Sequence, residues 1–300
     1  MRLGVDFGGT KIEGALLDSQ GEILVRERVR NPGNYEAAVR AVADLTMRIE
    51  EQTGQRAVTV GVGMPGSLSP ATGLVRNANS LWLNGKPFLE DLKAALKRPV
   101  RVENDANCFA LSEAVDGAAA HGRVVFGVIM GTGCGGGVVV ERKVIEGVNG
   151  IGGEWGHTPL PWARADEDAG RHWCGRPNCM EQWVSGSGFK RWSGLDAREA
   201  DEAARAGDVK ARVALDLLAD RLARGLAVVI DILDPDVIVF GGGVSNIESL
   251  YPSVRGKLLA HVFSDVLRTD LVKNRHGDSS GVRGAAWLFG PEGEPSEQMQ

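Results

Sequence analysis

The sequence lacks long hydrophobic runs, an excess of positive charge and a dense set of cysteines. Apolar stretches such as Val124 to Met130 are far shorter than the roughly 18 residues that a membrane-spanning helix requires. Lysine and arginine number 34 against 39 aspartates and glutamates, and the net charge of −5 disfavours a nucleic-acid partner. Asp6 interrupts the first apolar stretch, where a signal peptide needs an unbroken one. We therefore expect a cytoplasmic protein without a membrane partner.

Only four cysteines occur in the 300 residues, and their uneven spacing does not indicate disulfides. Cys108 and Cys134 are isolated, which is typical of buried apolar positions, whereas Cys174 and Cys179 lie close together beside His172. Glycine is abundant, at 41 residues, and it gathers in short runs without a fixed period. Such runs exclude a collagen-like chain and favour pockets that are built from backbone.

Alternating apolar stretches and turns predict an α/β protein. Residues 2–30 fit three consecutive antiparallel strands, and apolar residues at helical spacing follow over 36–51. The later chain predicts a long helix within 201–233, which Asp234-Pro235 ends, and then a buried strand at 237–240.

A weak internal repeat indicates that the chain has two similar halves. A shift of 123 positions aligns Gly4 with Gly127, Gly8 with Gly131 and Gly14 with Gly137. A second half would then also begin with a strand, a glycine turn and a strand. Because glycine is common in this sequence, duplication and chance both stay open at this point.

Three glycine turns follow expected strands and offer main-chain N–H groups to an anion. They are Asp6 to Lys11, Gly131 to Gly137 and Gly241 to Gly243. Each alone also suits a tight hairpin or a strand-to-helix connection, and none has Walker or Rossmann spacing. Three in one chain favour a nucleotide with several phosphates, because glycine lets the backbone approach a ligand closely. Asp6, at a strand end, suits a Mg²⁺ ion bound through water, or else caps its turn.

Polar residues gather between the two expected halves. Asn104 and Asp105 follow a short strand and precede a helix expected to run to about Ala120, so either residue can be the helix N-cap. In the functional interpretation, Asp105 is the general base that takes a proton from a substrate hydroxyl, and Asn104 orients that substrate. Glu154 and His157 are either surface residues or further substrate contacts.

A candidate metal site combines an upstream histidine with a His-x-Cys-x₄-Cys pattern. The four residues are His157, His172, Cys174 and Cys179. Two imidazoles and two thiolates satisfy tetrahedral zinc and leave no open position, so the ion would be structural and would hold the loop that presents Glu181. The alternative is a chance gathering of these residues in a loop.

Together these motifs resemble the ROK family (repressor, open reading frame, kinase) of bacterial sugar kinases, over Arg2 to about Phe289. The resemblance implies an α/β fold with two RNase H-like lobes and an interlobe cleft, as in actin, Hsp70 and hexokinase. We expect an N-terminal lobe of residues 1–118 and a larger C-terminal lobe of residues 119–280 that carries the zinc loop. A helix at 281–290 is expected to pack back on the first lobe, and the polar tail at 291–300 to be disordered.

The resemblance implies an ATP-dependent hexose kinase that acts on the 6-hydroxyl, with Asp105 as its general base. The positions expected to bind the sugar are Gly66, Asn79, Asn104, Asp105, Glu154, His157 and Glu181. Those expected to bind ATP are Asp6, Gly8, Gly9, Thr10, Lys11, Gly131, Thr132, Gly133, Gly241, Gly242, Gly243 and Asn246. Asp6 would hold Mg²⁺ through water, and His157, His172, Cys174 and Cys179 would hold zinc.

Three segments, 77–85, 159–162 and 276–284, resemble the bacterial fructokinase branch of the family. They imply fructose as the sugar, with mannose and glucose as further hexoses. A glucokinase, an N-acetylhexosamine kinase and a non-catalytic sugar sensor of the same family are the alternatives. A repressor is disfavoured, because an N-terminal helix-turn-helix has no room before the strand that begins at Arg2. The resemblance also implies a homodimer.

One departure from the family pattern concerns the metal. The family usually has Cys-x-Cys-Gly-x-x-Gly-Cys, whereas His172 stands here at the first cysteine and Asn178 at the second glycine. Because imidazole is itself a good zinc ligand, we expect the ion to be retained with two histidines and two cysteines.

Overall fold

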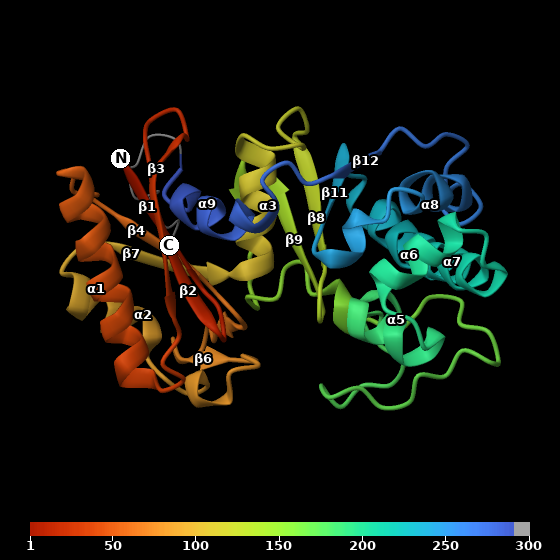
Figure 1. Ribbon diagram of the computed structural model, residues 1–300, viewed down its shortest axis with the longest axis horizontal. Helices are drawn as coiled ribbons and strands as arrows, with labels where there is room; N and C mark the ends of the chain where they lie inside the picture. Colours follow the sequence, from red (N-terminus) through yellow and green to blue (C-terminus); the bar gives the residue numbers. More distant parts are fainter. Residues whose placement is uncertain (291–300) are drawn as a thin grey trace.

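The computed structural model describes residues 1–290 and has two halves, each built on a five-stranded sheet (Figure 1). The strand orders are β3-β2-β1-β4-β7 and β10-β9-β8-β11-β12. In both sheets the first three strands are antiparallel and the last two join in parallel, so one topology occurs twice. The expected two-lobe α/β fold is confirmed. The tail at 291–300, expected to be disordered, lies outside the described residues.

The strands of the first half are β1 (Arg2–Phe7), β2 (Lys11–Leu17), β3 (Ile23–Arg30), β4 (Val60–Met64) and β7 (Val100–Asn104), with a small ribbon of β5 (Ser67–Leu68) and β6 (Val75–Arg76). Its helices are α1 (Tyr35–Thr53), α2 (Phe88–Leu96) and α3 (Asp105–Val115). The second sheet comprises β8 (Val124–Met130), β9 (Cys134–Val140), β10 (Lys143–Val144), β11 (Val237–Gly241) and β12 (Asp270–Lys273). The remaining helices are α4 (Glu181–Val184), α5 (Gly186–Ser193), α6 (Ala197–Arg205), α7 (Val209–Leu233), α8 (Leu250–Leu258) and α9 (Ser280–Trp287).

The internal repeat corresponds to the two hairpins that open each half. Phe7 pairs with Ile12 across the first turn, and Met130 pairs with Cys134 across the second. The second turn is therefore one residue shorter, and the offset between the halves falls by one after it. Gly14 consequently corresponds to Gly136, so its expected alignment with Gly137 is wrong by one residue.

Helix α3 is shorter than expected, because it ends at Val115 and not near Ala120. The Glu113 carboxylate accepts a hydrogen bond from the Ala118 N–H at 2.9 Å, and the Glu113 carbonyl accepts one from the Ala119 N–H at 3.0 Å. These bonds fold the chain into a tight turn. Local apolar spacing does not reveal this stop, because a carboxylate inside the helix makes it.

Helix α9 returns to the first half and packs on its sheet and on α3 (Figure 1). Glycines make this close approach possible: a Cβ at Gly61 of β4 would lie 1.8 Å from the Ala285 carbonyl oxygen, and one at Gly284 would lie 1.7 Å from that of Cys108. On its other side, α3 buries Phe109 and Leu111 against the second sheet. Helix α3 therefore lies between the halves and places its first residue, Asp105, at the cleft.

Changing Gly61 to alanine is expected to lower the free energy of unfolding by about 2–3 kcal/mol, because the α9 backbone must move off β4 to admit the methyl group. Gly256, which is exposed on helix α8, is the matched control, since no described residue beyond its own stretch of helix lies within 4 Å of a Cβ there and alanine should stabilise the helix by up to about 1 kcal/mol. Urea unfolding of both variants measures the difference. A G61A midpoint equal to that of the wild type would contradict this packing.

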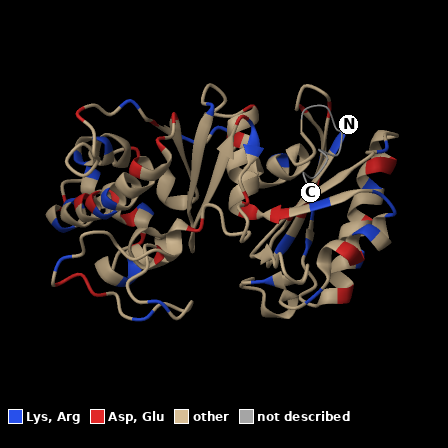
Figure 2. Ribbon diagram, turned by 180° about the vertical axis from the view of Figure 1, so that it is seen from behind, with Lys and Arg blue, Asp and Glu red and all other residues tan. Residues whose placement is uncertain are grey.

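Lysine and arginine are interspersed with aspartate and glutamate over both halves in the view from behind (Figure 2). Within residues 1–290, every helix is too short or too polar to cross a membrane.

Candidate active site

The N-terminus of α3 presents the polar pair Asn104 and Asp105. Asn104 has extended backbone and its side-chain oxygen accepts from the Ala106 N–H at 2.9 Å, so Asn104 is the N-cap. Its side-chain nitrogen donates to the Gly66 carbonyl at 3.1 Å. The capping interpretation is thus correct for Asn104. Asp105, the first helical residue, lines the cleft between the halves.

A cavity of about 380 Å³ joins residues of both halves. Its lining consists of Asp6, Asp105, Phe109, Ile129, Gly242, Gly243, Ser245, Asn246, Asn274, Gly277, Asp278, Ser280 and Gly281. It gathers the expected base with four of the expected ATP positions. The stretch from Asn274 to Gly281 was missed as part of the site, although its run of glycine, serine and aspartate resembles the other turns.

Asp6 and Asp105 are two carboxylates in this one cavity. Burial between the halves raises the pKa of Asp105 to about 6, and the negative charges of Asp6 and Glu154 add to the effect. Burial likewise raises the pKa of Asp6 to about 6, with a further contribution from Glu13. Asp105 is therefore more basic than an ordinary aspartate and still ionised at pH 7, which suits a general base.

Of the three turns expected to bind phosphates, the first contributes only Asp6 to this lining, the second contributes none of its residues, and the third contributes Gly242 and Gly243. The Gly8 N–H donates to the Lys11 carbonyl at 2.9 Å, while Gly9 and Thr10 are exposed. In the second turn, the Gly131 N–H donates to Gly133 at 3.0 Å. These hydrogen bonds belong to the hairpins, and only exposed groups of the turns are available to a ligand.

The third turn, after β11, approaches the second closely. Gly242 has a φ of 81°, and a Cβ there would lie 2.5 Å from the Met130 carbonyl. A Cβ at Gly241 would lie 2.5 Å from the Phe109 ring. Glycine is therefore required at both positions by packing. Gly131, Thr132, Gly133 and Gly241 keep their expected ATP role as a prediction.

The structure brings the expected sugar positions together only in part, since Gly66, Asn79, His157 and Glu181 line neither the cavity of about 380 Å³ nor the next one. Asn104 and Glu154 line a second, smaller cavity of about 50 Å³. His157 Nε2 lies 3.8 Å from Glu154 Oε2. Gly66 has a φ of 81°, and a Cβ there would lie 2.4 Å from the Arg76 carbonyl. Asn79 is exposed and borders neither cavity.

Glu181, at the start of α4, is the most thoroughly hydrogen-bonded of the expected sugar contacts. Its Oε2 accepts from the Cys134 N–H at 2.8 Å, and its Oε1 accepts from Trp173 Nε1 at 2.8 Å and contacts His172 Nε2 at 2.8 Å. Burial alone favours the neutral acid, but the bonds from Cys134, Trp173 and His172 outweigh it and lower the pKa of Glu181. The side chain is thus a fixed carboxylate beside the second glycine turn.

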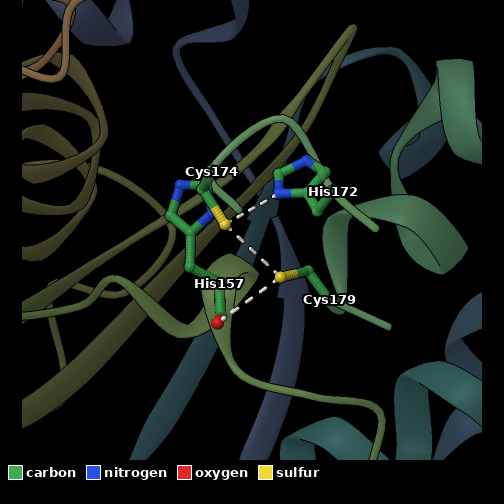
Figure 3. Close-up of side chains that lie close together, drawn as sticks. All are labelled: His157, His172, Cys174 and Cys179. Atoms are coloured by element: carbon green, nitrogen blue, oxygen red, sulfur yellow. Dashed lines mark hydrogen bonds between the residues drawn. The ribbon is translucent and has the colours of Figure 1, made fainter. Parts of the chain in front are cut away.

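The four candidate metal ligands come together in the structure (Figure 3). One ligand atom from each of His157, His172, Cys174 and Cys179 lies within 4.8 Å of the others. Cys174 Sγ is 3.2 Å from His172 Nδ1 and 3.7 Å from Cys179 Sγ. His157 Nδ1 is buried without a hydrogen-bond partner among the described residues. Two thiols, two imidazoles and an unsatisfied nitrogen fit a tetrahedral metal site.

A pair of carboxyl groups faces the small cavity from opposite halves. Burial raises the pKa of Glu103, at the end of β7, and the charge and hydrogen bond of Glu146 raise it further. Hydrogen bonds from Asn107 and the Asn104 N–H only partly offset this. A carboxyl group whose pKa is raised by folding binds more protons folded than unfolded, so its contribution to stability falls as pH rises from about 5 to 8.

Replacing Glu146 with glutamine should reduce the loss of stability that ionisation of Glu103 causes at high pH. We expect E146Q to raise the free energy of unfolding at pH 8 by about 1 kcal/mol, since water screens the exposed Glu146, and to have little effect at pH 5. Urea titrations at both pH values measure the difference. Glu141, exposed on the neighbouring turn, is the control, and E141Q should change neither value. A gain from E146Q that is the same at both pH values would count against this interaction between Glu146 and Glu103.

Comparison with known proteins supports the expectation that the chain is a sugar kinase. The sequence model of the ROK family matches residues 2–292. The N-acetyl-D-glucosamine kinase of Pasteurella multocida (strain Pm70) is 39% identical over 302 residues, covering 96% of this chain and 99% of that protein. The ROK hexokinase from Thermus thermophilus superposes with a TM-score of 0.84 at 31% identity, covering 96% of this chain and 97% of that one.

A second solved structure contains ligands. The ROK family glucokinase from Streptomyces griseus, in complex with glucose and AMPPNP, has a TM-score of 0.76 at 28% identity and covers 96% of this chain and 98% of that one. The expected sugar kinase fold is thus confirmed. The expected fructokinase branch finds no support in these comparisons, whereas the N-acetylhexosamine kinase alternative does.

Proposed function

The chain belongs to the ROK family, and we propose that this sugar kinase transfers the terminal phosphoryl group of ATP to the 6-hydroxyl of a hexose, with Asp105 as the general base. The observation that carries the proposal is that Asp105 lines one cavity while its neighbour in the chain, Asn104, lines a second one. One contains Asp6, Gly242, Gly243 and Asn246, and the other contains Asn104 and Glu154. A hexose bound on the side of Asn104 and the γ-phosphate of ATP bound on the side of Asp6 would meet at the Asp105 carboxylate.

The proposed reaction requires little covalent chemistry from the protein. The sugar oxygen attacks the γ-phosphorus, its proton passes to the Asp105 carboxylate, and the bond to the ADP oxygen breaks. Mg²⁺, a part of the nucleotide substrate, would reach Asp6 through water. In a loose transition state, positioning and neutralisation of charge supply most of the rate, so closure of the two halves around both substrates would matter as much as the base.

We place N-acetyl-D-glucosamine first among the hexoses. Its support is the similarity to the Pasteurella enzyme over nearly the full length of both chains. Fructose is the second candidate, because of the fructokinase-like segments 77–85, 159–162 and 276–284. The last of these contributes Gly277, Asp278, Ser280 and Gly281 to the cavity of about 380 Å³, and Ser80 of the first lies 3.3 Å from where a Gly9 Cβ would be.

A coupled ADP-release assay tests the function and the sugar together. N-acetyl-D-glucosamine, fructose, glucose and mannose are each supplied with ATP and Mg²⁺, and kcat/KM is compared. We expect one hexose to be preferred by at least tenfold, because buried polar groups left unpaired penalise the wrong hydroxyl pattern. Absence of ADP release with all four would refute the proposal and favour a non-catalytic sugar sensor.

We propose further that the cluster of His157, His172, Cys174 and Cys179 binds one structural zinc ion. Support comes from the four converging ligand atoms and from His157 Nδ1, which has no hydrogen-bond partner within residues 1–290. The ion would keep the loop that carries Glu181 in place. The homodimer, the cytoplasmic location and the lobe boundaries at 118 and 280 stay predictions, which light scattering, fractionation and limited proteolysis would test.

A further inference from the structure

We propose that His172 is a positioning residue that joins the metal cluster to the sugar-binding carboxylate of Glu181. The proposal rests on the sugar and zinc sites proposed above. It assigns a second task to the one residue in the cluster that departs from the family's usual cysteine, namely holding Glu181 in the orientation that accepts the sugar hydroxyls.

The geometry places the two nitrogens of one imidazole on two different partners. His172 Nδ1 lies 3.2 Å from Cys174 Sγ on the metal side, and His172 Nε2 lies 2.8 Å from Glu181 Oε1. Figure 3 shows the second ring nitrogen pointing away from the two sulfur atoms. The His172 side chain is 6% exposed and that of Glu181 17%, so water competes little for this contact.

A cysteine at position 172 could bind the metal but could not make this contact. A metal on Nδ1 fixes the proton on Nε2, which then donates to the carboxylate, and such histidine–carboxylate pairs orient both groups. The net charge of the metal site also favours histidine over cysteine at position 172. Zn²⁺ with two thiolates and two neutral imidazoles is neutral overall, whereas a third thiolate would leave a negative site next to Glu181.

Glu181 also contacts the second glycine turn, which is expected to bind phosphate. Glu181 Oε2 accepts from the Cys134 N–H, directly after the glycine turn, and a Cβ at Gly133 would lie 2.8 Å from the same oxygen. One carboxylate therefore contacts the metal loop through His172 and the second turn through Cys134. The metal, by fixing His172, would set the position of a group that the hexose must meet.

The first arm of the test is His172→Cys, which keeps a metal ligand and removes the second nitrogen. We expect H172C to retain one zinc per chain and to raise the KM for the preferred hexose about tenfold with kcat little changed, since Glu181 contacts the sugar before and during reaction. In the cobalt-substituted protein, sulfur-to-cobalt absorption should rise from two thiolates to three. Arg171→Ala, in the same loop with an exposed side chain, should behave as wild type. A wild-type KM in zinc-loaded H172C would overturn the proposal.

The second arm measures the link from the metal side, and its zinc-binding measurement needs no kinase activity. Glu181→Gln should weaken zinc binding about tenfold in competition with a chromogenic chelator, because the carboxylate no longer supports the imidazole. In the double variant H172C/E181Q the rise in KM should not exceed that of the larger single variant. Unchanged zinc affinity in E181Q, or multiplicative effects on KM, would overturn the link.

The two arms separate this inference from the proposed function. If the wild-type protein phosphorylates none of the four hexoses, the function fails, while zinc affinity in E181Q and the cobalt spectrum still decide the link. If the protein is an active kinase but E181Q binds zinc as tightly as the wild type does, only the link between His172 and Glu181 fails. A purified active protein that binds no zinc at any concentration would overturn the link together with the metal site.

Discussion

Replacing Asp105 with asparagine is expected to lower kcat by about 10²–10⁴-fold while the KM values for the hexose and ATP change little. The amide has the shape of the carboxylate and can still accept a hydrogen bond from the sugar hydroxyl, but it cannot take the proton. Asn104 remains to cap α3, so the helix that carries position 105 should keep its place.

Steady-state kinetics and pH dependence measure this effect. In the wild type, kcat/KM should fall below about pH 6, because protonation of Asp105, whose pKa is raised to about 6, removes the base. The residual activity of D105N should lack that ionisation. Asp116, at the other end of the same helix, is the matched control: it pairs with Arg283 and His276, so D116N should lower stability and leave the pH profile unchanged. A kcat for D105N within fivefold of the wild type would falsify the role of the base.

Several parts of the site could be predicted from the sequence because they depend on residues that are close together in the chain. The hairpin after β1, the N-cap at Asn104 and the His-x-Cys-x₄-Cys pattern each depend on neighbours in the chain. Apolar spacing likewise predicted α1 over 36–51, where the structure has Tyr35–Thr53. Patterns of this kind carry their own physical cause, so the predicted hairpin, N-cap and α1 agree with the structure to within a few residues. The four candidate metal ligands also lie close together, while the zinc ion itself stays a proposal.

Other features depend on contacts between distant segments, and the sequence did not reveal them. The stretch from Asn274 to Gly281 lines the large cavity only because α9 packs back on β1 and β4. The hydrogen bond between the Cys134 N–H and Glu181 joins residues 47 positions apart in the chain. Preference for one hexose depends on such geometry, which explains why the resemblance to fructokinases and the similarity to N-acetyl-D-glucosamine kinases point to different sugars.

Removal of a metal-ligating thiol should have the second large effect. Changing Cys179 to serine is expected to abolish tight zinc binding and to raise the Kd for the hexose by about 100-fold or more, because Glu154, His157 and Glu181 lose their common support. Cys179 is fully buried, and its neighbours hold the loop by two main-chain bonds, from the Leu160 N–H to Asn178 and from the Met180 N–H to Thr158.

The fold should survive this change, because a second anchor holds the loop without metal. Buried Glu167 accepts from Arg224 at 2.6 Å and from Arg221 at 3.0 Å, and both arginines belong to α7. Loss of sugar binding with retained ATP binding, measured by calorimetry on the same preparation, would therefore locate the defect in the loop. Cys108→Ala is the control, since that buried cysteine lies on α3 outside the metal cluster and its variant should keep both zinc and hexose. Wild-type hexose affinity in metal-free C179S would mean that the loop holds its sugar contacts unaided.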